Sequence, residues 1–171
     1  MSFASIILTL VTLQRLGELV LARRNTERLM ARGAIEIGAK HYPLVVSVHA
    51  AWLIALWTFG RDQDANLFAL AFFVLLQIMR LWILSSLGSR WTTRIIILRG
   101  EPLITSGPYR YVSHPNYAVV VGEIVVLPLA LHLPGVAIVF TLLNAAVLVI
   151  RVREETRALS ATGGGLSRAN R

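Results

Sequence analysis

Residues 117–150 read YAVVVGEIVVLPLALHLPGVAIVFTLLNAAVLVI, and this stretch decides the kind of fold. It holds two apolar runs, 117–133 and 134–150, with only the short segment 132–135 at their junction. A helix that crosses the hydrocarbon core of a membrane needs about 20 mostly apolar residues. Two such runs with so short a connection predict a tight helical hairpin, in which Pro134 occupies the first turn of the returning helix.

Three further apolar stretches of similar length precede the hairpin, at Phe3–Leu21, Tyr42–Phe59 and Asn66–Leu87. The chain of 171 residues is 56% hydrophobic and only 15% charged, which is too few charged residues to cover a soluble protein. The sequence therefore predicts an all-α, polytopic membrane protein with about five transmembrane helices. We expect a single domain over residues 1–162 and a flexible, glycine-rich tail over residues 163–171.

The arginines predict how the chain is oriented. The net charge is +8, with Lys40 as the only lysine, and the basic residues follow the first, third and fifth apolar runs. The opposite loops hold only Arg61, offset by Asp62 and Asp64. Because basic loops stay in the cytosol, we expect the N-terminus outside and the C-terminus inside, in the inner membrane if the source is bacterial. Arginines beside apolar spans indicate lipid headgroups as partners rather than nucleic acid.

Ionisable residues inside the spans are costly, and they are functional candidates for that reason. They fall at similar depth in the first, third and fourth runs. The charged ones are Arg15, Glu18, Arg80 and Glu123, and Gln14 and Gln77 accompany them. We predict one shared cavity that opens to the cytosol. The alternative is that the arginines reach toward headgroups and pair structurally with the glutamates.

The densest polar segment, GPYRYVSHPNY over Gly107–Tyr117, opens directly into the fourth apolar run. Pro115 disfavours helix at His114, and Asn116 is predicted to cap a helix that begins at Tyr117. Free backbone N–H groups at a helix N-terminus attract carboxylates and phosphates. This turn is therefore a candidate binding site at the membrane surface.

Together with Glu123, Pro128 and the segment after the hairpin, this turn resembles the signature of isoprenylcysteine carboxyl methyltransferase-type membrane enzymes, in a bacterial subgroup. The family pattern reads roughly Gly-Pro-Tyr-x-x-x-Arg-His-Pro-x-Tyr, and Ser113 stands here where arginine is usual. After the hairpin the family has Arg-x-x-x-Glu-Glu-x-x-Leu. The corresponding RVREETRAL, residues 151–159, leaves either Glu154 or Glu155 as the motif glutamate.

The resemblance implies that S-adenosylmethionine is held between the turn before the fourth span and the helix after the hairpin. It implies His114, Tyr117 and Glu155 as cofactor contacts, with Tyr109 and Arg110 lining the same pocket. Methyl transfer from a sulfonium needs no metal. The chain has no cysteine, which excludes Cys-ligated zinc and thiol nucleophiles.

The expected reaction is O-methylation of a lipophilic carboxylate or phenol at the cytosolic face of the membrane. A carboxylate is already ionised and needs only a cation such as Arg80 or Arg153 to position it. A phenol, with an unperturbed pKa of about 10, needs a base, for which His114 or Glu123 can serve. Glu123, Arg80 and Arg153 are therefore the catalytic candidates.

Three other readings stay open: a phospholipid amine N-methyltransferase, an NADPH-dependent reductase of sterol or polyprenoid type, and a membrane protein without enzymatic activity. The membrane reductases share a similar His-Pro-x-Tyr hairpin. Cofactor binding separates the readings, because both methyltransferases bind S-adenosylmethionine and a reductase needs basic groups for the phosphate of its nicotinamide cofactor. The sequence leaves the acceptor's identity and the oligomeric state undetermined.

Overall fold

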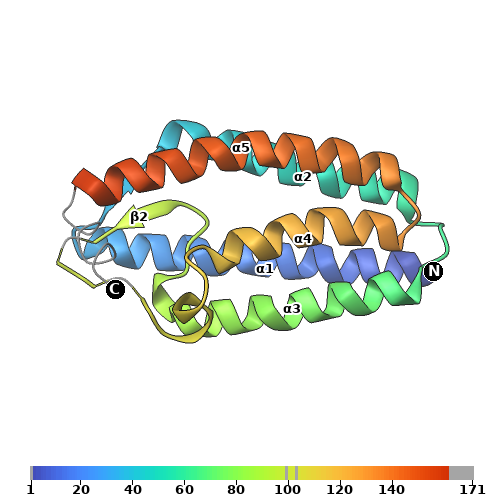
Figure 1. Cartoon of the computed structure of the whole chain (residues 1–171), viewed down its shortest axis with the longest axis horizontal. Coiled ribbons are helices and arrows are strands. Elements are labelled where there is room, and N and C mark those ends of the chain that lie inside the picture. Colours follow the sequence, from blue (N-terminus) through green and yellow to red (C-terminus); the bar gives the residue numbers. More distant parts are fainter. Residues whose placement is uncertain (1, 99, 103, 162–171) are drawn as a thin grey trace.

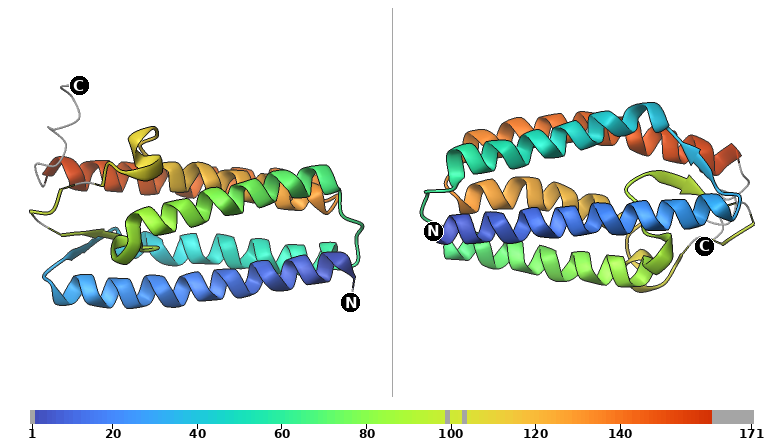
Figure 2. Two further views of the ribbon diagram at one scale, coloured as in Figure 1. Left: turned by 90° about the horizontal axis from the view of Figure 1, so that it is seen from below. Right: turned by 180° about the vertical axis from the view of Figure 1, so that it is seen from behind.

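The computed structural model describes residues 2–98, 100–102 and 104–161 as an elongated helical bundle. Helices α3, α4 and α5 lie in one layer, and α1 and α2 lie behind them (Figures 1 and 2). The helices are α1 (Phe3–Ala31), α2 (Tyr42–Gly60), α3 (Leu67–Leu87), α4 (Pro115–Ala130) and α5 (Pro134–Ala161). The short elements are β1 (Ile35–Ile37), β2 (Ile95–Ile97) and the 3-10 turns η1 (Ala39–His41), η2 (Gly88–Arg90) and η3 (Gly107–Arg110).

The prediction of an all-α polytopic membrane fold is confirmed. Among the described residues, four helices, α1, α2, α3 and α5, are long and apolar enough to cross a membrane. Helix α4 has 16 residues and is about 24 Å long, shorter than a hydrocarbon core of about 30 Å. It lies between α3 and α5 and packs against both (Figure 1).

Two helices continue well beyond their apolar runs. α1 ends at Ala31 rather than Leu21, and α5 ends at Ala161 rather than Ile150. Hydropathy marks only the part of a helix that lies in lipid, whereas arginine and glutamate in the following residues are good helix formers. Both helices therefore project from the apolar part of the bundle at its basic end.

The hairpin between α4 and α5 is closed by backbone hydrogen bonds. The N–H of Leu133 donates to the carbonyl of Pro128 at 2.8 Å, and the N–H of His132 donates to Leu129 at 3.1 Å. His132 has a φ of 56°, the left-handed conformation that such a helix ending requires. α5 then begins at Pro134, as predicted.

A small antiparallel sheet was not expected from the sequence. β1 pairs with β2 so that Ile35 lies opposite Ile97 and Glu36 opposite Ile96. The sheet joins the segment after α1 to the segment after α3, far from the hairpin tip and the N-terminus (Figure 1). All three basic segments begin at this end, which we call the basic end.

The buried apolar core is narrow. Its main cluster lies between the helices and includes Leu8, Trp52, Leu56 and Leu127. Many other large apolar side chains, such as Phe68 at 75% exposure, face outward instead. An apolar exterior around a small core is the arrangement that a lipid environment stabilises, so the chain is an integral membrane protein.

Candidate active site

A cleft lies at the basic end, between the β1–β2 sheet, the start of α2 and the C-terminal half of α5. The cleft holds about 350 Å³ of empty space, a figure that includes open solvent. Apolar side chains such as Val45 and Val147 line it on the side of the membrane helices. Its polar lining is Glu36, His41, Tyr42, Thr93, Arg94, Arg151 and Glu154.

The wall formed by the sheet and α2 is held by polar contacts among its own residues. Nη1 of Arg94 donates to Oε1 of Glu36 at 2.7 Å, and the guanidinium lies 4.3 Å from the centre of the Tyr42 ring. The Tyr42 hydroxyl and Thr93 Oγ1 are 3.0 Å apart and share a hydrogen bond. An ion pair that also stacks on an aromatic ring holds this wall in one geometry.

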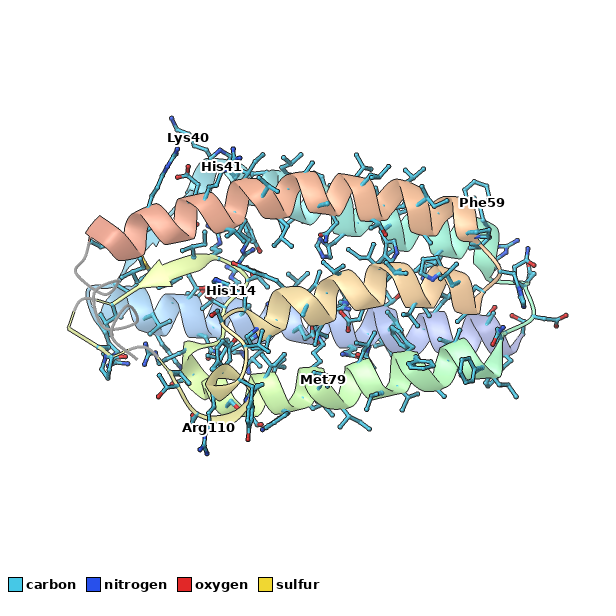
Figure 3. The ribbon with its side chains drawn as sticks, in the orientation of Figure 1. Lys40, His41, Phe59, Met79, Arg110 and His114 are labelled. Atoms are coloured by element: carbon cyan, nitrogen blue, oxygen red, sulfur yellow. The ribbon has the colours of Figure 1, made fainter. Side chains whose placement is uncertain are left out.

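The opposite wall joins the two halves of the sequence signature. Nε of Arg151, on α5, donates to the hydroxyl of Tyr117, on α4, at 3.1 Å, and its guanidinium lies 5.6 Å from the Tyr117 ring centre. The His114 ring stacks on Tyr117 with centroids 5.1 Å apart. Since Arg151 also lines the cleft, the hairpin brings the turn before α4 to the edge of this site (Figure 3).

The start of α4 differs from the prediction. The helix begins at Pro115 rather than Tyr117, with His114 in the capping position and proline at the first helical residue, which it favours. Asn116 lies within the first turn, and its buried Oδ1 accepts no hydrogen bond among the described residues. Asn116 is therefore not the helix cap.

On α5 the cleft is lined by Arg151 and Glu154, which are three residues apart and share a helix face. Arg153 is exposed and lies outside the lining, because two residues along a helix turn a side chain to another face. The structure thus places Arg151, and not Arg153, at the site. Glu155 belongs to α5, but its side chain is outside the described part of the chain, so its predicted role stays a prediction.

Tyr109 and Arg110, which the resemblance implies as lining of the cofactor pocket, do not line this cleft. Tyr109 packs against the small cluster around Ile83 and Trp91, and Arg110 is exposed and points away from the bundle beyond α3 (Figure 3). The reason is that η3 docks on the end of α3: Gly107 has a φ of 58°, and a Cβ there would overlap the Ser86 hydroxyl. His114 does not line the cleft either, and it reaches the edge of the cleft only through its stacking on Tyr117.

The four charged residues predicted inside the membrane do meet, as one network of ion pairs. Arg80 donates from Nε and Nη2 to the two oxygens of Glu18 at 2.5 and 2.6 Å, and from Nη1 to Glu123 at 2.9 Å. Arg15 donates to Glu123 at 2.7 Å and to Glu18 at 3.1 Å. Two arginines facing two glutamates leave this network with no net charge.

Two glutamines complete the network and fill the space expected to be a cavity. Gln14 donates to Glu18 and to Gln77, and Gln77 donates to Glu123 at 2.8 Å. The Glu123 side chain is only 1% exposed and that of Arg80 only 6%. The predicted cavity open to the cytosol is thus closed by the polar groups themselves, and the alternative of structural pairing describes the contacts better.

Sequence reasoning missed the N-terminal wall of the cleft, which comprises Glu36, His41, Tyr42, Thr93 and Arg94. The available signal was the pair of β-branched runs Ile-Glu-Ile at 35–37 and Ile-Ile-Ile at 95–97, which are typical of strands. Runs of three residues are too short to stand out beside helices of 16 to 29 residues.

The bundle and its cleft define a polytopic membrane protein with a candidate ligand site near the point where the start of α4 meets α5. The sequence profile of the isoprenylcysteine carboxyl methyltransferase (ICMT) family matches residues 69–161, more than half of the chain, and the chain belongs to this family. It is accordingly a membrane methyltransferase in the general sense of that family.

Two curated relatives match over nearly the whole chain. The uncharacterized protein YpbQ of Bacillus subtilis is 34% identical over 159 residues, which are 90% of this chain and 95% of the relative. An uncharacterized protein of Haemophilus influenzae is 26% identical over 166 residues, 94% of this chain and 96% of the relative. No solved structure gives a significant match.

Proposed function

We propose that the protein transfers the methyl group of S-adenosylmethionine to an oxygen of a lipophilic carboxylate or phenol at the cytosolic membrane face. The observation that carries this proposal is the hydrogen bond from Arg151 to Tyr117 at the edge of the cleft. It links the two signature segments at the basic end. Basic segments stay in the cytosol, so the site belongs on that side, with the N-terminus outside and the C-terminus inside.

The cleft suits a cofactor that carries both signs of charge. S-adenosylmethionine, when bound, supplies an electrophilic methyl group on a sulfonium, and its other polar groups are a carboxylate, an ammonium and ribose hydroxyls. Among the side chains that the structure describes, Tyr117 is the only hydrogen-bond partner of Arg151, so its terminal nitrogens can hold a carboxylate. Glu154 on the same helix face suits an ammonium or a hydroxyl.

The protein's own contribution is alignment and exclusion of water. Holding two reactants in line can supply about 7–11 kcal/mol of the barrier. The apolar side of the cleft, formed by Val45 and Val147, belongs to helices that cross the membrane, so an amphiphile can keep its tail in lipid with its polar end in the cleft. This supports a lipophilic acceptor over a water-soluble one.

The reductase alternative is less well supported by the charges of the cleft. Its described lining has two arginines, Arg94 and Arg151, and two glutamates, Glu36 and Glu154, and Arg94 is already paired with Glu36. A phosphorylated dinucleotide needs an excess of basic groups, whereas a zwitterionic cofactor needs both signs. Transfer to a phospholipid amine is compatible with the same cleft.

Calorimetry on the detergent-solubilised protein tests the proposal, with S-adenosylmethionine and its demethylated product as ligands. We expect binding that weakens about five- to tenfold in Tyr117→Phe, because that variant loses the hydroxyl that holds the Arg151 guanidinium in position at the cleft. Tyr111→Phe, at an exposed tyrosine, is the matched control and should bind like the wild type. Isotope-labelled methyl transfer into a lipid extract then identifies the acceptor. Binding of NADPH without binding of S-adenosylmethionine would replace the proposal by the reductase.

A further inference from the structure

His41 ends the short turn η1 and faces the cleft from the side opposite α5. It belongs to the N-terminal part of the chain, outside residues 69–161, to which the family profile corresponds. Its Nδ1 is buried and has no hydrogen-bond partner among the described residues. Gly38, at a φ of 65°, lies beside it: a Cβ built there would be 3.8 Å from Nδ1 and 3.8 Å from Cβ of Glu154.

A buried nitrogen without a partner needs a physical explanation. Leaving such a group unsatisfied costs about 1–3 kcal/mol, and most buried polar groups in proteins are paired for this reason. The neighbouring polar groups of the same wall satisfy each other, as Glu36 does with Arg94 and Tyr42 with Thr93. His41 is the exception within the described wall, so its Nδ1 is available to a ligand that enters the cleft.

The tautomer of the His41 ring follows from the surroundings of Nδ1. A proton on Nδ1 would be a buried donor with no acceptor among the described residues, whereas the tautomer with its proton on Nε2 leaves only a lone pair at Nδ1. The charged groups that face His41 are Glu36 on β1, Arg94 on β2, and Arg151 and Glu154 on α5, and their charges cancel. Nδ1 therefore offers a lone pair to a ligand that brings a hydrogen-bond donor.

The two bases that the sequence suggests for a phenol, His114 and Glu123, are less suitable than His41 to accept its proton. Both oxygens of Glu123 already accept hydrogen bonds, Oε2 from Arg15 and Arg80 and Oε1 from Gln77, and the side chain is closed off from the cleft. His114 stacks on Tyr117 and does not line the cleft. Among these three groups, only His41 combines a place in the cleft with a free acceptor atom.

We propose that His41 takes the proton of a hydroxyl group on the methyl acceptor, an inference that rests on the proposed methyl transfer. The hydroxyl oxygen uses its electron pair to form the bond to the methyl carbon, the carbon–sulfur bond of the methyl donor breaks, and the hydroxyl proton passes to Nδ1 and then to water. An ionised carboxylate brings no proton. His41 therefore selects a phenol-type acceptor over a carboxylate.

Acceptors of different acidity test this role. With an ordinary long-chain phenol, His41→Gln should lower kcat/KM at least about a hundredfold, the usual contribution of a general base. With a nitro-substituted analogue, assayed at a pH well above its own pKa so that it is ionised before it binds, the same variant should lose less than about threefold, because no proton has to be removed. Lys40→Gln, at the exposed neighbour on η1, and His132→Gln, at the hairpin tip, should behave like the wild type with both acceptors. An equal loss with both phenols would overturn the proposal.

A binding measurement without turnover gives the second readout. The chain has four histidines, so ¹⁵N-labelled histidine spectra are simple to assign with His41→Gln and His41→Asn. Adding the phenol alone, without methyl donor, should shift the Nδ1 resonance of His41 in the wild type, and no shift would contradict the proposal. S-adenosylmethionine should bind His41→Gln as it binds the wild type. If His41→Gln loses that binding, His41 belongs to the cofactor site instead. If the wild type neither binds the cofactor nor methylates either phenol, the proposed function itself is refuted.

Discussion

Arg80 on α3 donates two parallel hydrogen bonds to the carboxylate of Glu18 on α1, from Nε at 2.5 Å and from Nη2 at 2.6 Å. Its third nitrogen reaches Glu123 on α4, so one guanidinium ties together three helices. An unpaired charge in lipid is costly because no water solvates it. The ion pair therefore strongly favours the one arrangement of the helices in which both charges are paired. The same side chain that was expected to position a substrate is thus occupied by the protein itself.

Replacing Arg80 by methionine should therefore destabilise the fold. The variant keeps a side chain of similar length but leaves Glu18 and Glu123 sharing only Arg15, and breaking a buried pair typically costs about 3–5 kcal/mol. A thermal unfolding scan in detergent measures the effect as a lower Tm. The control is Arg23→Met, which breaks an exposed pair with Glu27 and should leave the Tm unchanged. An unchanged Tm for Arg80→Met would show that the network does not hold the helices.

Glu123→Gln distinguishes the structural from the catalytic role of the network. The amide keeps the shape of the side chain but removes the charge that balances Arg15 and Arg80. We expect a lower Tm, with cofactor affinity nearly unchanged and with little loss of methyl transfer per folded molecule. A large loss of methyl transfer at an unchanged Tm would instead support the catalytic role that the sequence predicts for Glu123 and Arg80.

The two arginines of α5 should respond differently to the same change. Arg151→Lys removes the Nε that donates to Tyr117 and the planar group at the cleft, so we expect cofactor affinity and kcat/KM to fall about tenfold or more. Arg153→Lys changes an exposed side chain and should have little effect on either. Calorimetry and labelled methyl transfer on both variants provide the comparison. Equal sensitivity of the two positions would mean that the cleft is not the site.

The orientation of the bundle can be measured directly. The arginine distribution predicts that a reporter fused after Arg171 reads cytosolic and that one inserted between Arg61 and Asp64 reads external. In the structure the connection between α2 and α3 and the end of α5 lie at opposite ends of the bundle (Figure 1). The reverse result at both positions would move the cleft to the outer face and remove the basis for a cytosolic methyl donor.

The sequence by itself determined the spans, the hairpin and the depth at which charges occur in them. These are local properties, because the transfer of an apolar run into lipid depends on its own composition and length. Pro134 starts α5 as predicted, and the resemblance placed Tyr117 correctly beside the helix after the hairpin. The predicted ends of the helices were less accurate than the predicted spans, because hydropathy does not show where a helix stops outside the lipid.

Only the tertiary structure decided which groups meet and which of them remain free for a ligand. Arg80 and Glu18 are 62 residues apart, and Arg15 and Glu123 are 108 apart, so their pairing depends on how whole helices pack. The same holds for the cleft, because the strands that form its wall come from segments separated by α2 and α3. His41 is a candidate for the same reason. The sequence shows that residue 41 is a histidine, but only the assembled fold shows that its Nδ1 has no hydrogen-bond partner among the described residues.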